Sequence, residues 1–517
     1  MALAAIVLAA ATSAPSPAPV VPDGTYRYET RIGGRTAGRS TIVVRHEGNV
    51  VTVRESATLA GASLVSERTI DASSFATISY AVDYLGTHAV VSILGNDATV
   101  IQGETTLKIS APPGAPFVVS DNMVAGFAQI PATLHASGEK QLTLACLCGG
   151  GFIPVPVKAT AARPGVVTIS VQDLAATLTF DPRSYALRRF ELPAQQLTIA
   201  LVSYDRQVVP LPQPVVPTPM PLPSANYQSR DVAIAADDGV TLAGTLTVPA
   251  AATQPVPGCV FVHGSGCIDR DETIGPNKVF AQLANRLSND GYAVLRYDKR
   301  SCGKSGGTFA ARDRLIADAR DAIAFLRAQP GVDAKRIFVL GHSEGGELAP
   351  SIAIDDGKLR GIVLLAPPAL PLDKILLQQI VAQAPPADRA AVEQKESADI
   401  AAIAAGKKPG ASNAWLRSSF GIDPADLIAR VPCPILIVQG GKDIQVLPTD
   451  LPRLVDAAKA AHRTVTVVTL DDDDHIFIKL PPNEPSTGGE YFTPATLDPA
   501  LYAAIEDWLN VEAKLRP

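Results

Sequence analysis

Hydrophobic and polar positions follow two different patterns along the chain, and the change between them divides it. Over residues 23–205, short runs rich in β-branched residues recur, as in STIVVRHEGNVVTVRES, where two runs flank Glu47-Gly48-Asn49 as in a hairpin. Helical periodicity is nearly absent from this region. The pattern therefore predicts a separate antiparallel β domain over residues 23–205, to which the sequence assigns no role.

From residue 229 to residue 517, apolar runs alternate with helical stretches. The apolar runs are PGCVFVH, YAVLRYD, RIFVLGH, GIVLLAP, PILIVQG and TVTVVTL. This alternation predicts an α/β fold, with a mostly parallel sheet covered by helices on both faces. The opening segment, DVAIAADDGVTLAGTLTVP, predicts an antiparallel hairpin at the edge of that sheet. Residues 367–430 interrupt the core with helical runs, which favours a helical cap, although a surface helical pair fits the same pattern.

A proline-rich segment at residues 206–228 separates the two patterns. Seven prolines fall between Pro210 and Pro223. Proline cannot donate a ladder hydrogen bond and favours the extended polyproline II conformation, which rises ~3.1 Å per residue. We expect a stiff linker here rather than a docking site for a proline-binding partner.

Residues 1–22 resemble a secretory signal. The apolar run Ala2–Ala11 is followed by the small residues Thr12-Ser13-Ala14, although no Lys or Arg precedes it. A disordered alanine- and proline-rich tail is the alternative. The run is too short to span a bilayer, and no later stretch reaches about 18 uninterrupted apolar residues. We therefore expect an exported protein, periplasmic or secreted, without a membrane span.

Composition narrows the classes of partner. The chain has 517 residues, 47% hydrophobic and 19% charged, which is typical of a globular protein of two or three domains. Its net charge is −6 and no basic patch stands out, so nucleic acid is not an expected partner. The sequence leaves the oligomeric state open.

The stretch GHSEGG carries the strongest chemical signal. Residues 341–345 match the pattern G-x-S-x-G and lie between a predicted strand and a predicted helix. A turn this sharp strains the serine backbone, so Gly341 and Gly345 are expected to remove side-chain clashes. The hydroxyl of Ser343 would then be exposed as a nucleophile, and the backbone N–H of Glu344 would face a developing oxyanion.

A serine nucleophile needs a base, and the base needs an orienting carboxylate. Asp443 follows the run PILIVQG and His475 follows TVTVVTL, so both are expected at the sheet edge that holds Ser343. His342 lies within the sharp turn and must point away, and His263 opens the HGSG loop, which leaves His475 as the base.

Two neighbouring segments complete the predicted site. In the run Asp471–Asp474 we expect a solvated acidic loop, with calcium binding a minor alternative. The HGSG loop supplies the second oxyanion donor, for which the amide of Ser265 is the first choice and that of Gly266 the next.

Together, HGSG with the following DRDETIGPNK, then RYDKR, then LGHSEGG resemble a carboxylesterase branch of the α/β-hydrolase superfamily. This branch is close to the dienelactone hydrolases and to the catalytic domain of prolyl-oligopeptidase-type enzymes. The resemblance covers residues 229–517 and says nothing about residues 25–204. It implies no metal or organic cofactor, and these roles: nucleophile Ser343, acid Asp443, base His475, and oxyanion donors Ser265 and Glu344.

The cysteines depart from this family resemblance. In the family fold the strands ending at His263 and Asp298 are neighbours, so the loops that carry Cys267 and Cys302 emerge side by side. We therefore predict a disulfide between Cys267 and Cys302. For Cys146-Leu147-Cys148 a local bridge, two free thiols and a metal contact all stay open.

The leading functional hypothesis is hydrolysis of a small-molecule carboxylic ester through an acyl-enzyme. A serine peptidase of the prolyl-oligopeptidase type is the first alternative, but residues 25–204 are too few for the seven-bladed propeller of those enzymes. An acyltransferase is the second alternative. A non-catalytic binding protein is disfavoured because all three catalytic positions are filled.

Overall fold

The structure is a computed structural model of the chain. It describes residues 21–59, 62–84, 87–102, 105–111, 116–120, 124–138, 140–148, 151–171, 174–193, 196–211, 220–223, 225–308, 310–383, 389–407, 411–486 and 488–514. Residues 1–20 of the signal-like segment (1–22) and residues 212–219 and 224 of the expected linker (206–228) lie outside this part. So do the side chains of Cys146 and Cys148.

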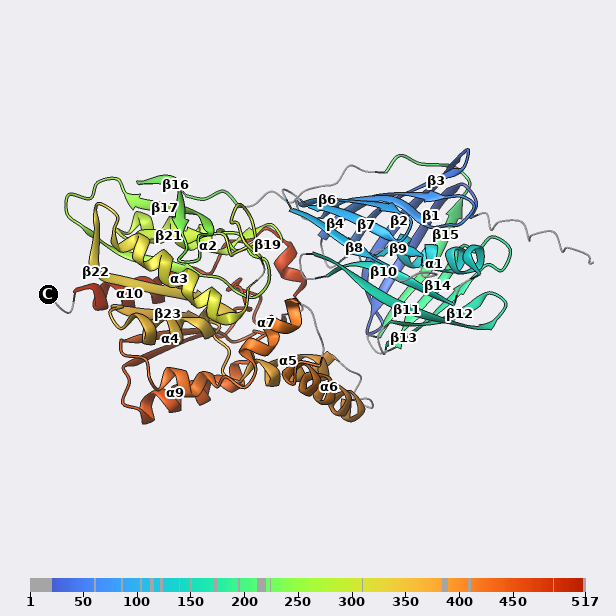
Figure 1. The fold of residues 1–517 in the computed structure, drawn as a ribbon. Helices are drawn as coiled ribbons and strands as arrows, with labels where there is room; N and C mark the ends of the chain where they lie inside the picture. Colours follow the sequence, from blue (N-terminus) through green and yellow to red (C-terminus); the bar gives the residue numbers. More distant parts are fainter. Residues whose placement is uncertain are drawn as a thin grey trace, which may run out of the picture.

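The N-terminal part of the chain forms one long curved sheet (Figure 1). Its strands pair in the order β8-β7-β6-β5-β4-β3-β2-β1-β15-β14-β13-β12-β11-β10-β9. They are β1 (Gly24–Ile32), β2 (Arg35–Glu47), β3 (Val50–Leu59), β4 (Ala62–Asp71), β5 (Thr77–Tyr84), β6 (Thr87–Leu94), β7 (Asp97–Gln102), β8 (Thr105–Ser110), β9 (Phe117–Ser120), β10 (Gln141–Cys148), β11 (Gly151–Arg163), β12 (Val166–Val171), β13 (Leu174–Phe180), β14 (Leu187–Leu192) and β15 (Leu197–Asp205).

The expected antiparallel pairing is confirmed for this sheet, with one exception. The predicted hairpin joins β2 to β3, where Glu47 pairs with Val50 across a turn in which Gly48 has a φ of 62°. The exception is β9, which pairs parallel to β10. The segment between these two strands forms helix α1 (Val124–Ser137), which the sequence pattern did not predict.

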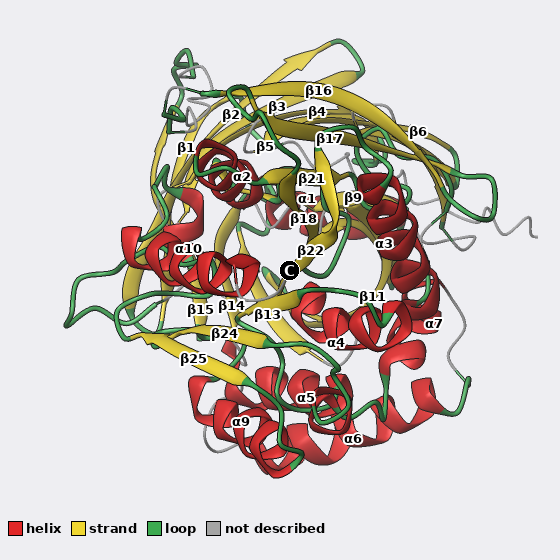
Figure 2. Ribbon diagram, turned by 90° about the vertical axis from the view of Figure 1, so that its left-hand side faces the viewer, coloured by secondary structure: helices red, strands yellow, loops and turns green. Residues whose placement is uncertain are grey.

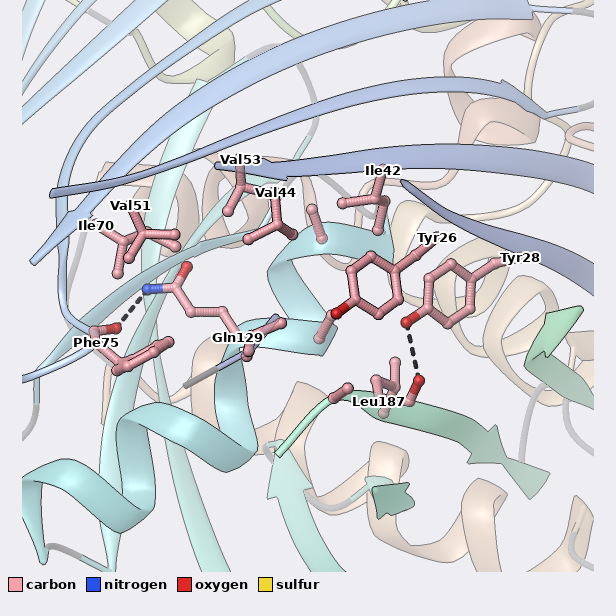
Figure 3. Close-up of a pocket in the computed structure, with 14 residues that line it drawn as sticks. Tyr26, Tyr28, Ile42, Val44, Val51, Val53, Ile70, Phe75, Gln129 and Leu187 are labelled. Carbon is pink, nitrogen blue, oxygen red and sulfur yellow. Dashed lines mark hydrogen bonds between the residues drawn. The ribbon is translucent and has the colours of Figure 1, made fainter. Parts of the chain in front are cut away.

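Helix α1 covers part of one face of the sheet and completes its core. The Gln129 side chain on α1 donates to the carbonyl oxygen of Phe75 at 2.7 Å, and the Tyr28 hydroxyl donates to that of Leu187 at 2.8 Å (Figure 3). Aliphatic side chains from β2, β3 and β4 surround these groups. They leave a mainly apolar cavity of about 40 Å³, which is a small packing void.

The C-terminal part contains the predicted mostly parallel sheet. Its strand order is β16-β17-β21-β18-β22-β23-β24-β25, and β16 and β17 form the predicted antiparallel edge hairpin. The central strands are buried along their whole length, as expected for apolar runs covered on both faces. The strands are β16 (Tyr227–Ala235), β17 (Thr241–Pro249), β18 (Val256–Val262), β21 (Ala293–Tyr297), β22 (Val332–His342), β23 (Gly361–Leu365), β24 (Ile435–Gly440) and β25 (Val465–Leu470), with the small hairpin β19 (Thr273–Ile274) and β20 (Asn277–Lys278) in a loop.

Helices cover both faces of this second sheet (Figure 2). On one face α3 (Arg312–Arg327), α4 (Glu344–Asp356) and α9 (Leu451–Ala460) share a hydrophobic core with the strands, and on the other face α2 (Val279–Asn289) and α10 (Pro499–Lys514) do so. The insertion between β23 and β24 is helical, as predicted. It contains α5 (Leu372–Gln383), α6 (Arg389–Ala404), α7 (Ala411–Ser419) and α8 (Pro424–Ile428).

Candidate active site

Ser343 lies in a strained turn between β22 and α4. Its backbone φ is 52° and its ψ is −117°, a conformation that non-glycine residues rarely adopt. A Cβ atom on Gly341 would collide with the backbone of Gly345, and one on Gly345 would collide with the carbonyl oxygen of Val262. The turn can therefore close only with glycine at both positions, and it holds Ser343 at the carboxyl end of the sheet.

Asp443 and His475 form a buried hydrogen-bonded pair at the same edge. Asp443 follows β24, His475 follows β25, and their Oδ2 and Nδ1 atoms are 2.7 Å apart. The backbone N–H groups of Gln445 and Val446 donate to the other carboxylate oxygen at 2.8 and 2.9 Å. Because a carboxylate can only accept, the Nδ1 atom of His475 carries a proton, and its Nε2 atom is left to act as a base.

Ser343 is linked to the Asp443–His475 pair through His342, the residue before it in the sequence. The side chain of His342 reaches the backbone carbonyl oxygen of His475 at 2.9 Å, and the two imidazole rings lie 4.9 Å apart. Among the described residues no direct hydrogen bond joins the hydroxyl of Ser343 to His475. Such bonds are often long in structures without substrate and shorten when it binds.

The two expected oxyanion donors lie beside Ser343. Ser265 and Glu344 both line the pocket that contains Ser343. The neighbouring amide of Gly264 is already committed, because it donates to the carboxylate of Glu272 at 2.8 Å. Within the described chain, the backbone N–H groups of Ser265 and Glu344 make no hydrogen bond. They are therefore available to a substrate oxygen.

The pocket beside Ser343 has a volume of about 140 Å³ and lies under the helical insertion. The insertion supplies most of its apolar wall, so these helices act as a cap over the site. Trp415, from helix α7 of the insertion, lines the pocket. The complete lining is Ser265, Ser343, Glu344, Glu347, Pro368, Leu370, Leu372, Ile375, Leu376, Trp415, Ser419, Ile422, Gln445 and Val446.

The side chain of Glu344 links the cap to the catalytic core. One carboxylate oxygen accepts from the indole N–H of Trp415 on α7 at 2.8 Å, and the other contacts the ammonium of Lys299 at 2.5 Å. Lys299 also donates to the carbonyl oxygen of Gly264 at 2.9 Å. The residue after Ser343 therefore contacts the cap directly and is linked to the HGSG loop through Lys299.

A second carboxylate in the pocket, that of Glu347, is also paired. Arg312 donates to it from two nitrogen atoms, at 2.8 and 3.1 Å. Burial raises the pKa of Glu347, and the charge of Arg312 opposes that shift. Because Lys299 pairs with Glu344 in the same way, neither carboxylate leaves an unbalanced charge in the pocket.

The structure joins Cys267 to Cys302 in a disulfide. Their Cα atoms are 5.4 Å apart, and they lie in the loops that follow the adjacent parallel strands β18 and β21. The bond thus ties the HGSG loop, which carries Ser265, to the loop after β21.

The acidic run before His475 is not the uniformly solvated loop expected from the sequence. Asp471 is exposed, but Asp473 and Asp474 are buried, with 1% and 0% exposure. Burial raises the pKa of Asp473 to about 8, with a further contribution from the charge of Asp498, and burial raises the pKa of Asp474 to about 7. The loop folds back because Asp474 accepts the backbone N–H groups of Ile476 and Ile478.

In the part of the chain that the structure describes, no group of three or more His, Cys, Asp or Glu side chains is placed to hold a metal ion. None of the described helices combines the length and apolar character needed to cross a bilayer.

Sequence reasoning missed two side chains that organise the site, those of Glu272 and Lys299. Glu272 and Lys299 lie in the motifs DRDETIG and RYDKR, which carried the family resemblance but were given no role. Their positions just after strands β18 and β21 were the signal that could have identified them, since such loops meet at the carboxyl edge of the sheet.

Comparison with known proteins matches residues 259–485 to the alpha/beta hydrolase family. Esterase EstD of Thermotoga maritima is 32% identical over 293 residues, which are 55% of this chain and 68% of EstD. The esterase Pf2001 of Pyrococcus furiosus superposes with a TM-score of 0.40 at 19% identity, covering 57% of this chain and 98% of that one. Est1E of Butyrivibrio proteoclasticus gives a TM-score of 0.38 at 16% identity, covering 55% and 98%.

Proposed function

Since the chain belongs to the α/β-hydrolase family, we propose that it is a serine hydrolase that cleaves carboxylic esters through an acyl-enzyme intermediate. The observation that carries this proposal is the buried hydrogen bond between Asp443 and His475 at the edge that holds Ser343 in its strained turn. The esterase named among its relatives, EstD, agrees with this choice of reaction.

The proposed reaction has two halves, acylation and deacylation of Ser343, and in each half His475 acts first as a base and then as an acid. His475 takes the proton of the Ser343 hydroxyl through Nε2 while the oxygen attacks the ester carbonyl carbon. The resulting oxyanion accepts hydrogen bonds from the backbone N–H groups of Ser265 and Glu344. His475 then gives its proton to the departing alcohol, which leaves Ser343 acylated. In the second half His475 takes a proton from water as the water oxygen attacks the acyl carbon, and it returns this proton to the Ser343 oxygen as the acid departs.

The charges around the pocket favour a neutral acyl group over an aminoacyl group. A peptidase that removes residues from a free amino end needs an unpaired carboxylate to bind the substrate ammonium. Both pocket carboxylates are already paired, Glu344 with Lys299 and Glu347 with Arg312. The volume of about 140 Å³ is close to the ~150 Å³ of an apolar cavity that admits benzene, so a short acyl chain or a single ring fits.

We also propose that the protein works outside the reducing cytoplasm. The disulfide between Cys267 and Cys302 supports this proposal, because such bonds persist mainly in oxidising compartments. The signal-like segment over residues 1–22 agrees with export. Cell fractionation of the source organism, followed by detection of the chain, tests it; recovery only from the cytoplasm would reject it.

Serine labelling and ester turnover test the catalytic proposal. The wild type should react with a fluorophosphonate probe and hydrolyse p-nitrophenyl butyrate faster than an aminoacyl p-nitroanilide. Ser343→Ala should abolish labelling and lower kcat by at least about a thousandfold. Ser229→Ala, at an exposed position on β16, is the matched control and should change neither. A folded wild type that is not labelled would contradict the proposal.

A further inference from the structure

The side chain of His342 bridges three segments that surround the nucleophile. It is 1% exposed and lies at the end of β22, directly before Ser343. Its Nε2 atom is 2.9 Å from the backbone carbonyl oxygen of His475, and its Nδ1 atom is 3.0 Å from Oε1 of Glu272. That same Oε1 accepts the backbone N–H of Gly264 at 2.8 Å.

The proton count of this chain of hydrogen bonds is constrained. A carbonyl oxygen only accepts, so Nε2 of His342 must carry a proton. One more proton lies between Nδ1 and Oε1 of Glu272, since either a carboxylate faces an imidazolium or a carboxylic acid faces a neutral ring. Both forms have the same number of protons, and they differ only in where the charge resides.

Two pKa directions favour the charged form. Burial by itself lowers the pKa of His342, but the charge of Glu272 and the hydrogen bonds to Glu272 and His475 leave it raised. Burial by itself raises the pKa of Glu272, but the charge of His342 and the hydrogen bonds from His342 and Gly264 leave it lowered. Each partner therefore stabilises the ionised form of the other.

We propose that His342 is a positioning residue: as an imidazolium paired with Glu272, it fixes the HGSG loop, the turn of Ser343 and the His475 loop relative to one another. This inference rests on the proposed function. The pair acts without touching substrate, because both of its side chains are buried behind the site. It connects the backbone of Gly264, next to the oxyanion donor Ser265, to the backbone of His475 through only two side chains.

The same pair places a permanent positive charge next to the base. The imidazole rings of His342 and His475 lie 4.9 Å apart, and the negative partner Glu272 lies on the far side of His342. Because removing a positive charge favours protonation of a neighbouring imidazole, variants that lose this charge should change the dependence of activity on pH.

Few other charged groups face the pair from the elements packed around it. Asp443 faces it from behind His475, and Lys299 faces the Gly264 end, where it donates to the Gly264 carbonyl. His263 lies beside Glu272, but burial lowers its pKa to about 4, so it is neutral near pH 7. Among the described residues, His342 is therefore the group in ion-pair contact with Glu272 that can balance its charge.

Nitrogen NMR of the wild type tests the charge state directly. The full chain, labelled with ¹⁵N-histidine, contains seven histidines. We expect one of them to keep both ring protons from about pH 5 to about pH 9, far beyond the range of an ordinary histidine. If all seven lose a ring proton below about pH 8, the proposal is overturned, and this readout depends on neither activity nor a variant.

Two variants test the positioning role, with His46→Gln as the matched control because His46 lies half-buried in the N-terminal sheet. His342→Gln and Glu272→Gln should each lower kcat by about tenfold to a hundredfold, with KM for p-nitrophenyl butyrate nearly unchanged. In both, the acid limb of kcat/KM against pH should move upward by about one unit. His46→Gln should leave the kinetics and the limb unchanged.

The outcomes separate the two proposals. If His342→Gln and Glu272→Gln fold but the acid limb of kcat/KM against pH does not move, the His342–Glu272 pair is only a structural contact and the inference is overturned. If Ser343 does not react with the fluorophosphonate probe, the proposed function is wrong. The NMR titration tests the charge on His342 independently of that result. If either variant does not fold, the wild-type titration remains decisive.

Discussion

At the scale of single residues, the buried carboxyl groups of Asp473 and Asp474 make the stability of the fold depend on pH. Burial raises their pKa values to about 8 and about 7, so the folded chain binds protons that the unfolded chain, with a pKa near 4, releases earlier. Where the folded state binds more protons, stability falls as pH rises. These two groups therefore stabilise the fold fully below about pH 4 and lose that contribution as pH rises through about 7 to 8.

Replacing the carboxyl group of Asp473 by an amide should remove part of this dependence. We expect Asp473→Asn to be more stable than the wild type at pH 9, by about 2 kcal/mol, and nearly equal to it at about pH 4, because the amide is neutral at both. Thermal unfolding followed by circular dichroism across this range measures the difference. Asp471→Asn, at an exposed position, is the control. Equal pH dependence in Asp473→Asn and wild type would contradict the expectation.

The three side chains proposed for catalysis could be placed at one edge of the sheet because each follows a strand. Ser343, Asp443 and His475 come directly after apolar runs whose carboxyl ends meet at one edge, and the structure brings the last two into a hydrogen bond there. The Glu272–His342 contact could not be predicted in the same way. It joins residues 70 apart in sequence, and neither residue shows a local pattern that names the other.

At the scale of elements, the alternation of strands and helices was read correctly over the C-terminal part, whereas α1 was missed. The sequence of α1, VAGFAQIPATLHAS, contains Pro131 and little periodicity. Its first turn is held by Glu55 on β3, whose carboxylate accepts the backbone N–H groups of Val124 and Ala125 at 3.1 and 2.7 Å. A helix stabilised by a carboxylate about 70 residues away leaves no local signature.

Helix α7 contacts the α/β part of the chain through the indole of Trp415, and also through Ser418, whose hydroxyl oxygen accepts the backbone N–H of Arg312 on α3. Trp415→Phe keeps the apolar ring and removes the N–H that donates to Glu344. We expect kcat/KM for p-nitrophenyl butyrate to fall about fivefold, corresponding to about 1 kcal/mol for one hydrogen bond. The other tryptophan, Trp508 on α10, packs on the opposite face of the sheet. Trp508→Phe should therefore lower stability without changing kcat/KM, and a fall in kcat/KM of equal size in both would contradict the role of α7.

The disulfide between the loops after β18 and β21 should stabilise the folded chain. It closes a segment whose ends are 35 residues apart, for which chain entropy predicts about 3 to 4 kcal/mol. The double variant Cys267→Ser/Cys302→Ser should lose about this much unfolding free energy in urea. A phosphine reductant should destabilise the wild type to the same level and leave the variant unchanged. Insensitivity of the wild type to reductant would show that the bond contributes nothing.

At the scale of the whole molecule, the two sheets have separate hydrophobic cores. The clusters around the mostly parallel sheet draw only on residues 232–513, and those of the N-terminal sheet only on residues 21–201. Each part therefore has the buried apolar interior that an independently folding unit requires.

This separation predicts that the catalytic part folds alone. A chain of residues 225–517 should give a single cooperative unfolding transition and a kcat/KM for p-nitrophenyl butyrate within about threefold of the full chain. Circular dichroism and initial rates on the two purified proteins make the comparison. A truncated chain that is insoluble, or folded but inactive, would show that the N-terminal sheet supports the site.

The bond between Cys267 and Cys302 also decides how the protein has to be prepared. A recombinant chain made in the reducing cytosol of an expression host would be purified without this disulfide, so the loop that carries Ser265 would lack its covalent tie to the loop after β21. Substrate screens on such material would test a protein whose predicted oxyanion loop is not held in place. Secretion into an oxidising space, or refolding in a glutathione buffer, is therefore the starting point for finding the natural ester.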